Sequence, residues 1–431
     1  MSRSLLSPAV GQYDPRLSDW SKAGYHEGQT PPTGSPITFG PGVHVLTQQQ
    51  VLASGTVLKG AGIGVTILEF PQPLSVMVGQ GEDGGTTGWS WGGGVLQAIA
   101  ASEVGIEDLT IRFPKVTYAG HHKEVGYNGL SFKNCHDCWV RNIEIINADN
   151  GLFFEGTSTH LTAINVILNA TRGTAYGWSA TGFAGNRTGH HGIELQRCTE
   201  SLVDGFDVQT TFLHDVGTEN AWGNVYRRGK GIDLNFDHHR SILSSHHNLW
   251  EDIEVGMGNR VFASAGPTTD PTKMHSKEGN VFWNIRRNGQ PLNTMAGYVA
   301  GPLWSPKLYL VGWDGTQSLG EPYLEKAISL EPSSLYAEQR GEAPVPTPEL
   351  PPEPDPMPTQ KFQIGNTVRC NTQSNIRSSP GIQTDNKLGT QPLGATGTVV
   401  EGPVPAGAHI WWRINFDGGV DGWCGEGTLN Q

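Results

Sequence analysis

An internal repeat constrains the fold of this chain more than any other feature of its sequence. Four units open with a glycine and a short apolar run, at Gly129, Gly151, Gly192 and Gly231. Counted from that glycine, the first and third units both carry a cysteine at +6 and apolar residues at +10, +11, +14 and +16. Each unit predicts three short strands joined by turns. Such strands are unstable alone but stable when stacked on their copies, so the sequence predicts an all-β chain folded as a β-helix solenoid.

The cysteines fit this prediction. Cys135 and Cys198 occupy the +6 position, which predicts a stack of cysteines inside the solenoid. Cys135 and Cys138 form a CxxC sequence that no second CxxC follows, so a buried structural role is expected rather than zinc or redox chemistry. Cys370 and Cys424 lie near the two ends of the C-terminal segment and would form a disulfide in an oxidising compartment.

A resemblance to a known superfamily supports the solenoid. Residues 57–68, VLKGAGIGVTIL, resemble the early coil of pectate-lyase-like proteins, and the coils over 129–255 resemble the same superfamily. The resemblance covers residues 37–340 and implies a right-handed parallel β-helix. That superfamily includes lyases, hydrolases, epimerases and viral adhesins, so the resemblance specifies the fold more closely than the substrate.

The chain is predicted to contain two domains. Residues 343–360 are rich in proline and acidic residues, which is typical of an extended linker. The linker separates a β-helix domain at 1–342 from a C-terminal segment at 361–431. Just before the linker, the serines at 333 and 334 and the pattern that follows predict a short helix within 331–339 that closes the β-helix.

The C-terminal segment, 361–431, resembles bacterial SH3-type domains. The residues that carry the resemblance are 362–368, 375–381, 394–400 and 411–416, and Asp421-Gly422-Trp423 closes the pattern. The resemblance implies a small SH3-like β-barrel that binds a cell-wall or other glycan. A passive spacer or an oligomer contact is the alternative.

Charge and composition limit the partners. The formal net charge is −12 and the pI is about 5.6, so nucleic-acid binding is not expected. No apolar run has membrane-spanning length, so no membrane partner is expected. The apolar patch near residues 5–6 is too short for the core of a signal peptide. We expect a secreted, periplasmic or cell-surface protein whose export signal has been removed, with a cytosolic location as the alternative.

The long inter-coil segments predict the binding face. Segments 113–128, 169–191, 210–230 and 256–280 would all leave one edge of a solenoid. They hold ten basic against five acidic residues, although the whole chain is acidic. Cationic and aromatic side chains suit an anionic glycan. The predicted substrate-binding residues in these segments are Tyr127, Arg172, Tyr176, Trp178, His190, Trp222, Tyr226, Arg227 and Arg260.

On a uronic-acid polymer, β-elimination is the leading chemistry. It requires a neutralised carboxylate, a base for the proton α to it, and an acid for the leaving oxygen. His214 with its neighbour Asp215 is the predicted base, and His190, His191 and Tyr226 are alternatives. The residues predicted to neutralise charge are Arg187, Arg227, Arg228 and Lys230.

A second histidine cluster follows the strand predicted at Gly231–Leu234. It contains His238, His239 and Arg240, with His246 and His247 further on. The local pattern resembles one found in a branch of bacterial β-helix proteins of the lyase type. We interpret 238–240 as further substrate-binding residues, and the histidine density leaves a metal role open.

Carboxylates form a third candidate site. Glu144, Asp207 and Glu254 fall on outward positions of the last strand of their coils, and Asp207 and Glu254 are expected about 5 Å apart on neighbouring coils. The superfamily resemblance implies that such acidic residues bind Ca²⁺. Glu194 and Asp233 form a similar predicted pair, and either pair could supply the acid and base of a glycoside hydrolase. A solvated sheet face is the alternative.

These observations predict a polysaccharide lyase that cleaves an acidic, uronic-acid-containing polysaccharide by β-elimination. A glycoside hydrolase on the same scaffold is the second hypothesis. A non-catalytic glycan-binding protein or adhesin is the third, and an isomerase of uronic acids is a minor fourth.

Overall fold

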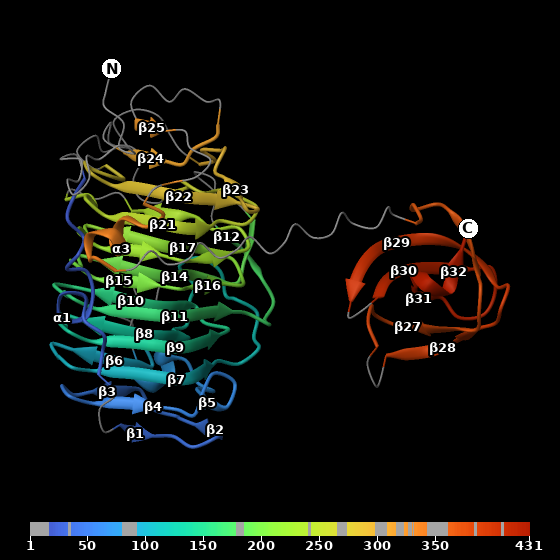
Figure 1. Cartoon of the computed structure of the whole chain (residues 1–431). Coiled ribbons are helices and arrows are strands. Elements are labelled where there is room, and N and C mark those ends of the chain that lie inside the picture. The colour runs from blue at the N-terminus through green and yellow to red at the C-terminus, as the bar shows by residue number, and fades with distance from the viewer. Residues whose placement is uncertain are drawn as a thin grey trace. The chain divides into compact units, whose positions relative to one another are not determined.

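The structure is a computed structural model that describes residues 17–32, 36–79, 93–177, 185–239, 243–264, 274–297, 308–315, 323–325, 330, 332–342, 361–382, 386–406 and 409–431. The chain divides into two compact units, Met1–Val345 and Pro346–Gln431. The first unit is a parallel β-helix, as predicted, whose coils stack from β1 at one end to β25 at the other (Figure 1). Within the described residues, no helix is both long enough and apolar enough to span a bilayer.

Two sheets form the walls of the β-helix, and nearly all of their strand pairs are parallel. We call the 16-stranded sheet the large sheet and the seven-stranded one the small sheet. The strands of the large sheet are β1 (Ile37–Thr38), β2 (Gly42–Val45), β4 (Val57–Lys59), β5 (Thr66–Glu69), β7 (Gly105–Arg112), β9 (Trp139–Ile146), β11 (Thr162–Asn169), β15 (Leu202–Asp204), β16 (Asp207–Val208), β18 (Val225–Arg227), β19 (Lys230–Gly231), β21 (Leu249–Glu254), β22 (Val281–Arg287), β23 (Gln290–Pro291), β24 (Tyr309–Val311) and β25 (Tyr323–Glu325). The strands of the small sheet are β3 (Gln50–Leu52), β6 (Leu96–Ile99), β8 (Asn128–Lys133), β10 (Asn150–Glu155), β14 (Gly189–Gln196), β17 (Phe212–Glu219) and β20 (Phe236–His238). A separate hairpin joins β12 (Ala175–Gly177) and β13 (Gly185–Arg187).

A bend in each coil divides the large sheet into two arms. One residue per coil has a positive φ at the bend, a conformation that Asn, Asp and Gly adopt most readily. The residues of this column are Asp108, Asn142, Asn165, Gly205, Arg228, Asp252 and Asn284. Several of them also join neighbouring coils, because Asn142 Nδ2 donates to Asp108 Oδ1 at 2.8 Å and Asn165 Nδ2 donates to Asn142 Oδ1 at 3.0 Å. The predicted three-strand unit is therefore a coil with one small-sheet strand and two large-sheet segments.

Apolar side chains fill the interior between the sheets. In the small sheet, Leu130, Leu152, Ile193 and Val216 are in register and completely buried or nearly so. In the large sheet, Tyr226, Trp250 and Phe282 stack face to face, with ring centroids 5.1 and 4.7 Å apart. Burial of this apolar column is the main source of stability in a solenoid.

A ladder of buried asparagines crosses one corner of the coils. Asn224 Nδ2 donates to Asn248 Oδ1 at 3.0 Å, and Asn248 Nδ2 donates to Asn280 Oδ1 at 3.2 Å. All three side chains are fully buried. The ladder also satisfies backbone groups of the turns. The backbone amides of residues 224 and 248 each donate to the side-chain oxygen of the asparagine one coil further on.

The predicted interior position of these cysteines is confirmed, because Cys135 and Cys198 belong to the interior apolar cluster, although Ser158 of the intervening coil lies between them. Cys138 is also completely buried in this cluster. All five thiols are free in the structure, so the disulfide predicted between Cys370 and Cys424 is not formed, and both thiols lie in the core of the second unit.

The predicted repeat register is correct at three units and wrong at the fourth. Gly129, Gly151 and Gly192 lie on β8, β10 and β14 of the small sheet. Gly231 lies instead on β19 of the large sheet, paired with Val208. A whole coil was missed, because β17 and β18 fill the segment 210–230 that the sequence predicted as a long loop.

The short helix α2 (Leu74–Met77) contributes Leu74 to the interior apolar cluster. The N-terminal segment and two other short helices, α1 (Tyr25–Gly28) and α3 (Leu335–Gln339), pack on the large sheet. The last of these is the predicted closing helix, and the Ser334 hydroxyl caps it by accepting from the amide of Ala337 at 3.1 Å. Trp20 and α3 pack on Val225, Leu249 and Val281, whose side chains point outward from the large sheet.

The second unit is a small antiparallel β domain. Its seven strands are β26 (Thr367–Cys370), β27 (Ser374–Arg377), β28 (Lys387–Gln391), β29 (Thr396–Ala406), β30 (His409–Phe416), β31 (Gly422–Gly425) and β32 (Leu429–Asn430), with the short 3₁₀ helix η1 (Glu426–Thr428) before the last. Phe362, Val368, Trp412 and Ile414 form its core. This architecture is compatible with the predicted SH3-like barrel.

Candidate active site

One outward-facing column of the small sheet carries two acidic residues. Ser131, Phe153, Glu194, Gly217 and Asp237 are in register on β8, β10, β14, β17 and β20. The residues on either side of this column point into the apolar interior, so the alternation of a β-strand places the column on the outer face. Glu194 and Asp237 are nevertheless buried, which makes them candidates for more than a solvated surface.

A glycine gives the carboxylate of Glu194 its position. A Cβ at Gly217 would lie 1.7 Å from Glu194 Oε2, so only a glycine leaves space for this carboxyl group over β17. Burial, and then the negative charges of Asp237 and Glu219, raise the pKa of Glu194 well above its ordinary value. The raised pKa favours the protonated carboxylic acid, the form that can donate a proton.

Asp237 connects Glu194 to the histidines. Its Oδ2 lies 3.0 Å from His214 Nδ1, and both side chains are almost completely buried. A carboxylate only accepts, so a proton on His214 Nδ1 would suit this contact. The charge of Asp237 also acts on His191 and Glu194, so one carboxylate influences all three groups electrostatically.

His191 is held by a polar ladder. Its Nδ1 lies 2.9 Å from Asn150 Oδ1, and Asn150 Nδ2 donates to Asn128 Oδ1 at 2.8 Å. The imidazole stacks on His190 at 3.9 Å between ring centroids and lies 4.8 Å from the ring of His214. Burial, followed by the neighbouring histidines, lowers the pKa of His191 well below its ordinary value, so the ring is neutral.

The segment between β7 and β8 completes the cluster. Glu124 Oε1 lies 3.1 Å from His190 Nδ1 and also accepts from the Tyr118 hydroxyl. The ring of His121 lies 4.6 Å from that of His190, edge to face. Burial lowers the pKa of His121 to about 4. His122 is exposed beside His121, so the cluster reaches the surface here. We call Glu194, Asp237 and the histidines at 121, 190, 191 and 214 the histidine site.

Several predicted residues stabilise the fold near this site instead of facing it. Asp215, predicted to orient His214, forms a buried ion pair with Arg260 and accepts from the amides of Phe212 and Asn235. The carboxylate beside His214 is that of Asp237, since Asp215 follows it on a β-strand and points the other way. Arg172 is buried against Asp149 at 2.9 Å.

Arg187 and His239 lie at the margins of the histidine site. Arg187 is the last residue of β13, and burial, followed by the nearby charge of Arg260, lowers the pKa of its guanidinium. His239 is partly exposed, 3.8 Å from Glu219. Tyr127 is mostly buried and packs on Phe113.

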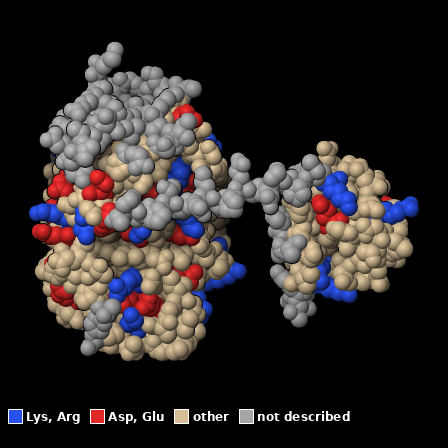
Figure 2. All heavy atoms as spheres, in the orientation of Figure 1, with Lys and Arg blue, Asp and Glu red and all other residues tan. Residues whose placement is uncertain are grey.

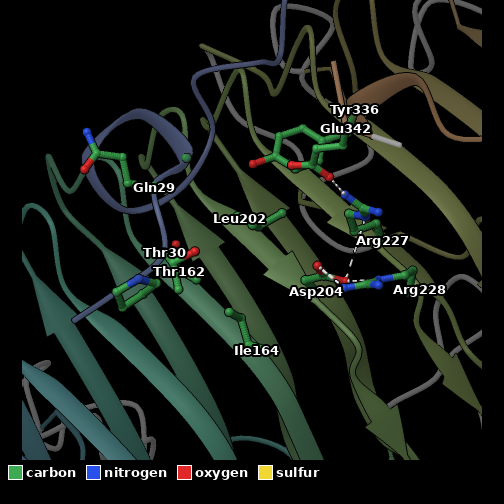
Figure 3. A pocket seen from close by; sticks show the side chains of 12 residues that line it. Gln29, Thr30, Thr162, Ile164, Leu202, Asp204, Arg227, Arg228, Tyr336 and Glu342 are labelled. Atoms are coloured by element: carbon green, nitrogen blue, oxygen red, sulfur yellow. Dashed lines mark hydrogen bonds and ion pairs between the residues drawn. The ribbon is translucent and has the colours of Figure 1, made fainter. Parts of the chain in front are cut away.

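The basic residues 227, 228 and 230 lie on the large sheet, away from the histidine site. Arg228 makes two hydrogen bonds of 2.6 Å with Asp204, and Lys230 lies 3.4 Å from Asp207. Arg227 is buried between Glu251 and Glu342. Arg227, Arg228 and Tyr336 line a hollow of about 160 Å³ (Figure 3). All three cations already have acidic partners on this sheet. Acidic and basic side chains also lie interspersed on the β-helix face in Figure 2.

Two predicted substrate-binding residues are core residues. Tyr226 is completely buried in the ring stack, and His238 is completely buried with its ring 4.7 Å from that of Trp250. Both predictions are wrong, because strand alternation turns these side chains inward. Trp222 stacks on His246 at another corner, 5.6 Å between centroids. Tyr176 lies on β12, in the hairpin with β13. Trp178 and Arg240 lie outside the described residues.

The predicted calcium ligands do not come together. Ile167 lies between Glu144 and Asp207 in the register of the large sheet, and Lys230 lies between Asp207 and Glu254. Asp207 pairs with Lys230, while Glu254 accepts from the backbone of Asn288 and Gly289. The expected 5 Å separation of Asp207 and Glu254 is wrong, because the missed coil inserts β19 between them. These residues do not fit one Ca²⁺ site.

The predicted Glu194–Asp233 pair is also wrong, since the register partner of Glu194 two strands away is Asp237. Asp233 instead accepts from the amide of Asn259 at 2.8 Å. Sequence reasoning thus missed Asp237, Glu124 and His121 as site residues. Asp237 precedes a histidine pair in the sequence, which was a usable signal, whereas nothing local distinguishes Glu124.

No family model matches the chain, and no curated protein matches it by sequence. Among solved structures, it is similar to the A-module of a mannuronan C-5 epimerase from Azotobacter vinelandii, with 15% identity, a TM-score of 0.36, and coverage of 68% of this chain and 72% of that one. An alginate lyase from Paenibacillus shows 10% identity, a TM-score of 0.38, and coverage of 69% and 93%. Carrot pectin methylesterase shows 12% identity, a TM-score of 0.37, and coverage of 74% and 91%.

Fold and site together define a parallel β-helix protein with a buried histidine and carboxylate cluster on the outer face of its small sheet.

Proposed function

We propose that the protein is a polysaccharide lyase that cleaves an acidic, uronic-acid-containing polysaccharide by β-elimination at the histidine site. The observation that supports this most strongly is a buried cluster on one face of the small sheet, in which two neighbouring imidazoles, His191 and His214, lie in the electrostatic reach of Asp237 together with a carboxyl group of raised pKa, Glu194. β-Elimination needs a base and an acid that act on adjacent carbons of one sugar ring.

The base is one of two imidazoles, His191 and His214. Nδ1 of His191 is hydrogen-bonded to Asn150 Oδ1 at 2.9 Å, and Nδ1 of His214 lies 3.0 Å from Asp237 Oδ2. Fixing the proton on Nδ1 leaves Nε2 as the nitrogen that accepts a proton from substrate. A proton α to a carboxylate is the weak acid that such a base removes.

The acid is Glu194. Its raised pKa keeps the proton in place until the bond to the leaving oxygen breaks. In the proposed reaction the α C–H bond breaks and its proton goes to the imidazole. A C=C bond then forms, the bond to the glycosidic oxygen breaks, and Glu194 protonates that oxygen.

A glycoside hydrolase is the second candidate, because Glu194 and Asp237 are two carboxyl groups on one face, and the charge of one acts on the other. In that mechanism Asp237 would have to attack the anomeric carbon or activate a water. Asp237 is instead engaged with His214 and almost completely buried. This contact favours the lyase.

An acidic polysaccharide substrate agrees with the expected secreted, periplasmic or cell-surface location. We propose that the second unit binds a glycan and keeps the enzyme near its polymer. Trp411 and Trp423 of this unit are buried, so they do not form an open surface on which a sugar could stack. A glycan ligand would therefore contact other positions.

Product analysis tests the proposal. The full chain is incubated with pectin, alginate, ulvan and glycosaminoglycans, while absorbance is followed at the band of unsaturated uronates. Rising absorbance supports the lyase. New reducing ends without absorbance would indicate the hydrolase, and binding without cleavage would indicate a glycan-binding protein.

Variants on the two sheets test where the chemistry occurs. His191→Ala and Glu194→Gln should abolish cleavage, while Arg228→Ala and Lys230→Ala on the large sheet should retain it. The reverse pattern would move the active site to the hollow of Figure 3 and contradict the proposal.

A further inference from the structure

Three histidines of the histidine site bring their ring nitrogens together. His121, His190 and His214 each offer one nitrogen, and these three atoms all lie within 4.8 Å of one another. The three residues come from different parts of the chain: the segment before β8, strand β14 and strand β17. From this convergence we propose a binding site for a divalent transition-metal ion, with the ligand chemistry that suits Zn²⁺.

The donor set points to this class of metal. Imidazole nitrogen suits zinc, copper, nickel and iron, whereas Ca²⁺ and Mg²⁺ prefer oxygen. Around a tetrahedral zinc with Zn–N distances of about 2.0–2.1 Å, ligand nitrogens are about 3.4 Å apart. The nitrogens of this cluster therefore need to close by an ångström or so, which small rotations of the rings provide.

Two buried carboxylates lie beside two of the proposed ligands. Glu124 Oε1 lies 3.1 Å from His190 Nδ1, and Asp237 Oδ2 lies 3.0 Å from His214 Nδ1. Metal-binding histidines usually donate their other ring N–H to such a partner, which fixes the tautomer and makes the ring a better ligand. Nε2 of His190 and His214 would then bind the ion. Two carboxylates also compensate the charge of a divalent ion in a site with little solvent.

A second cluster of possible ligands in the described residues does not share these features. His26, Glu103 and Asp137 come within the same distance of one another. The two ring nitrogens of His26, however, already lie 2.7 Å from Glu103 and 3.4 Å from Asp137, and this histidine is exposed. These contacts are surface ion pairs, so only the histidine site has both converging imidazoles and buried orienting carboxylates.

The ion would also complete the proposed chemistry, and this part rests on the proposed lyase function. Three protein ligands leave a fourth position open for a substrate oxygen. A bound uronate carboxylate would then be neutralised by the ion. His214 would serve the ion, which leaves His191 as the base and Glu194 as the acid.

Metal binding is measured directly on the full chain. The protein is stripped with a chelator, dialysed, and titrated with ZnCl₂ by calorimetry, and with CoCl₂ while visible absorbance is followed. We expect one ion per chain with micromolar or tighter affinity and the intense visible bands of tetrahedral Co²⁺. Absence of tight stoichiometric binding to the wild-type chain would overturn the site.

Variants place the ion and guard against unfolding. His121→Ala should abolish tight binding, and it changes a partly exposed residue whose loss the fold tolerates. Glu124→Gln keeps all three ligands and should weaken binding by about 10–100-fold. His246→Ala, in a histidine pair at another corner, is the control and should bind as the wild type does. Unchanged binding in His121→Ala would overturn the assignment.

The two proposals fail separately. Tight zinc binding without cleavage of any acidic polymer would leave the metal site standing and contradict the lyase. Full cleavage activity in the stripped protein would leave the lyase standing and contradict a role for the ion.

Discussion

Glu194 and Gly217 lie opposite each other on β14 and β17, and the carboxylate of Glu194 fills the space that a side chain at 217 would occupy. The clash of an added Cβ is with the end of a flexible side chain, not with backbone. The glycine is therefore dispensable for the strand but required for the position of the proposed acid.

Gly217→Ala should displace the Glu194 carboxylate while the β-helix stays folded. We expect cleavage to fall by about 100-fold, because misplacement of a catalytic group by an ångström has effects of this size. Thermal unfolding should change little. Gly40→Ala is the control for activity, since a Cβ there meets nothing within 4 Å.

Gly151→Ala gives the opposite comparison. Its Cβ would lie 2.4 Å from the backbone oxygen of Gly192, so this variant should lose stability.

Full activity in Gly217→Ala would show that the position of Glu194 does not matter for catalysis.

Replacement of Glu194 should make stability depend differently on pH. The folded-state pKa is raised, so the folded chain holds this proton more tightly than the unfolded chain does. Below the ordinary pKa of 4.5 Glu194 is protonated in both the folded and the unfolded state, so its ionisation does not change the free energy of unfolding. As pH rises above that value the unfolded state ionises first, which destabilises the fold by up to about 1.4 kcal/mol per pH unit until the folded pKa is reached.

Glu194→Gln removes this cost. Its melting temperature should match that of the wild type near pH 4 and exceed it increasingly toward neutral pH. Parallel melting curves across the whole pH range would contradict a raised pKa at Glu194. In the wild type, activity should decline as pH rises through the folded pKa, because the acid loses its proton.

Asp215 and Arg260 should prove structural. Arg260→Ala leaves the carboxylate of Asp215 buried without its cation and should cost about 3–5 kcal/mol in the free energy of unfolding. Urea unfolding followed by circular dichroism measures this. Arg286→Ala breaks a partly exposed pair with Asp252 and should cost less than about 1 kcal/mol. Equal costs would contradict the structural role.

The asparagine ladder should contribute stability without contributing to activity. Asn248→Ala removes an acceptor for the amide of Asn224 and a donor to the carbonyl of Ala221. Buried groups left unpaired cost about 1–3 kcal/mol each, so the variant should lose at least about 2 kcal/mol. Gln209→Ala, at an exposed site, should stay within about 0.5 kcal/mol of the wild type.

The fold was predictable from the sequence wherever a coil follows the apolar pattern. Gly129, Gly151 and Gly192 each precede residues that fill the interior, so their strands could be aligned without a structure. The coil of β17 was missed because its sequence, FLHDVGTE, contains site residues that interrupt the alternation. Functional sites are where local pattern and fold are expected to disagree.

The site could be predicted only in part. His190, His191 and His214 were recognised because they lie in or beside the long segments predicted to form the binding face. Their partners were not, because Asp237 and Glu124 come from other coils, and register errors of one strand change which side chains face each other. The basic residues 227, 228 and 230 were predicted to lie beside these histidines, but they belong to the opposite sheet.

Cleavage of acidic polysaccharides by matched variants tests the central claim most directly. Absorbance of unsaturated uronates is followed for the wild type, His191→Ala, Glu194→Gln and Lys230→Ala on the polymer that the wild type cleaves best. The account predicts rising absorbance for the wild type and Lys230→Ala, and a flat trace for the two variants of the histidine site. Undiminished absorbance from both of those variants, or reducing ends without absorbance from the wild type, would contradict it.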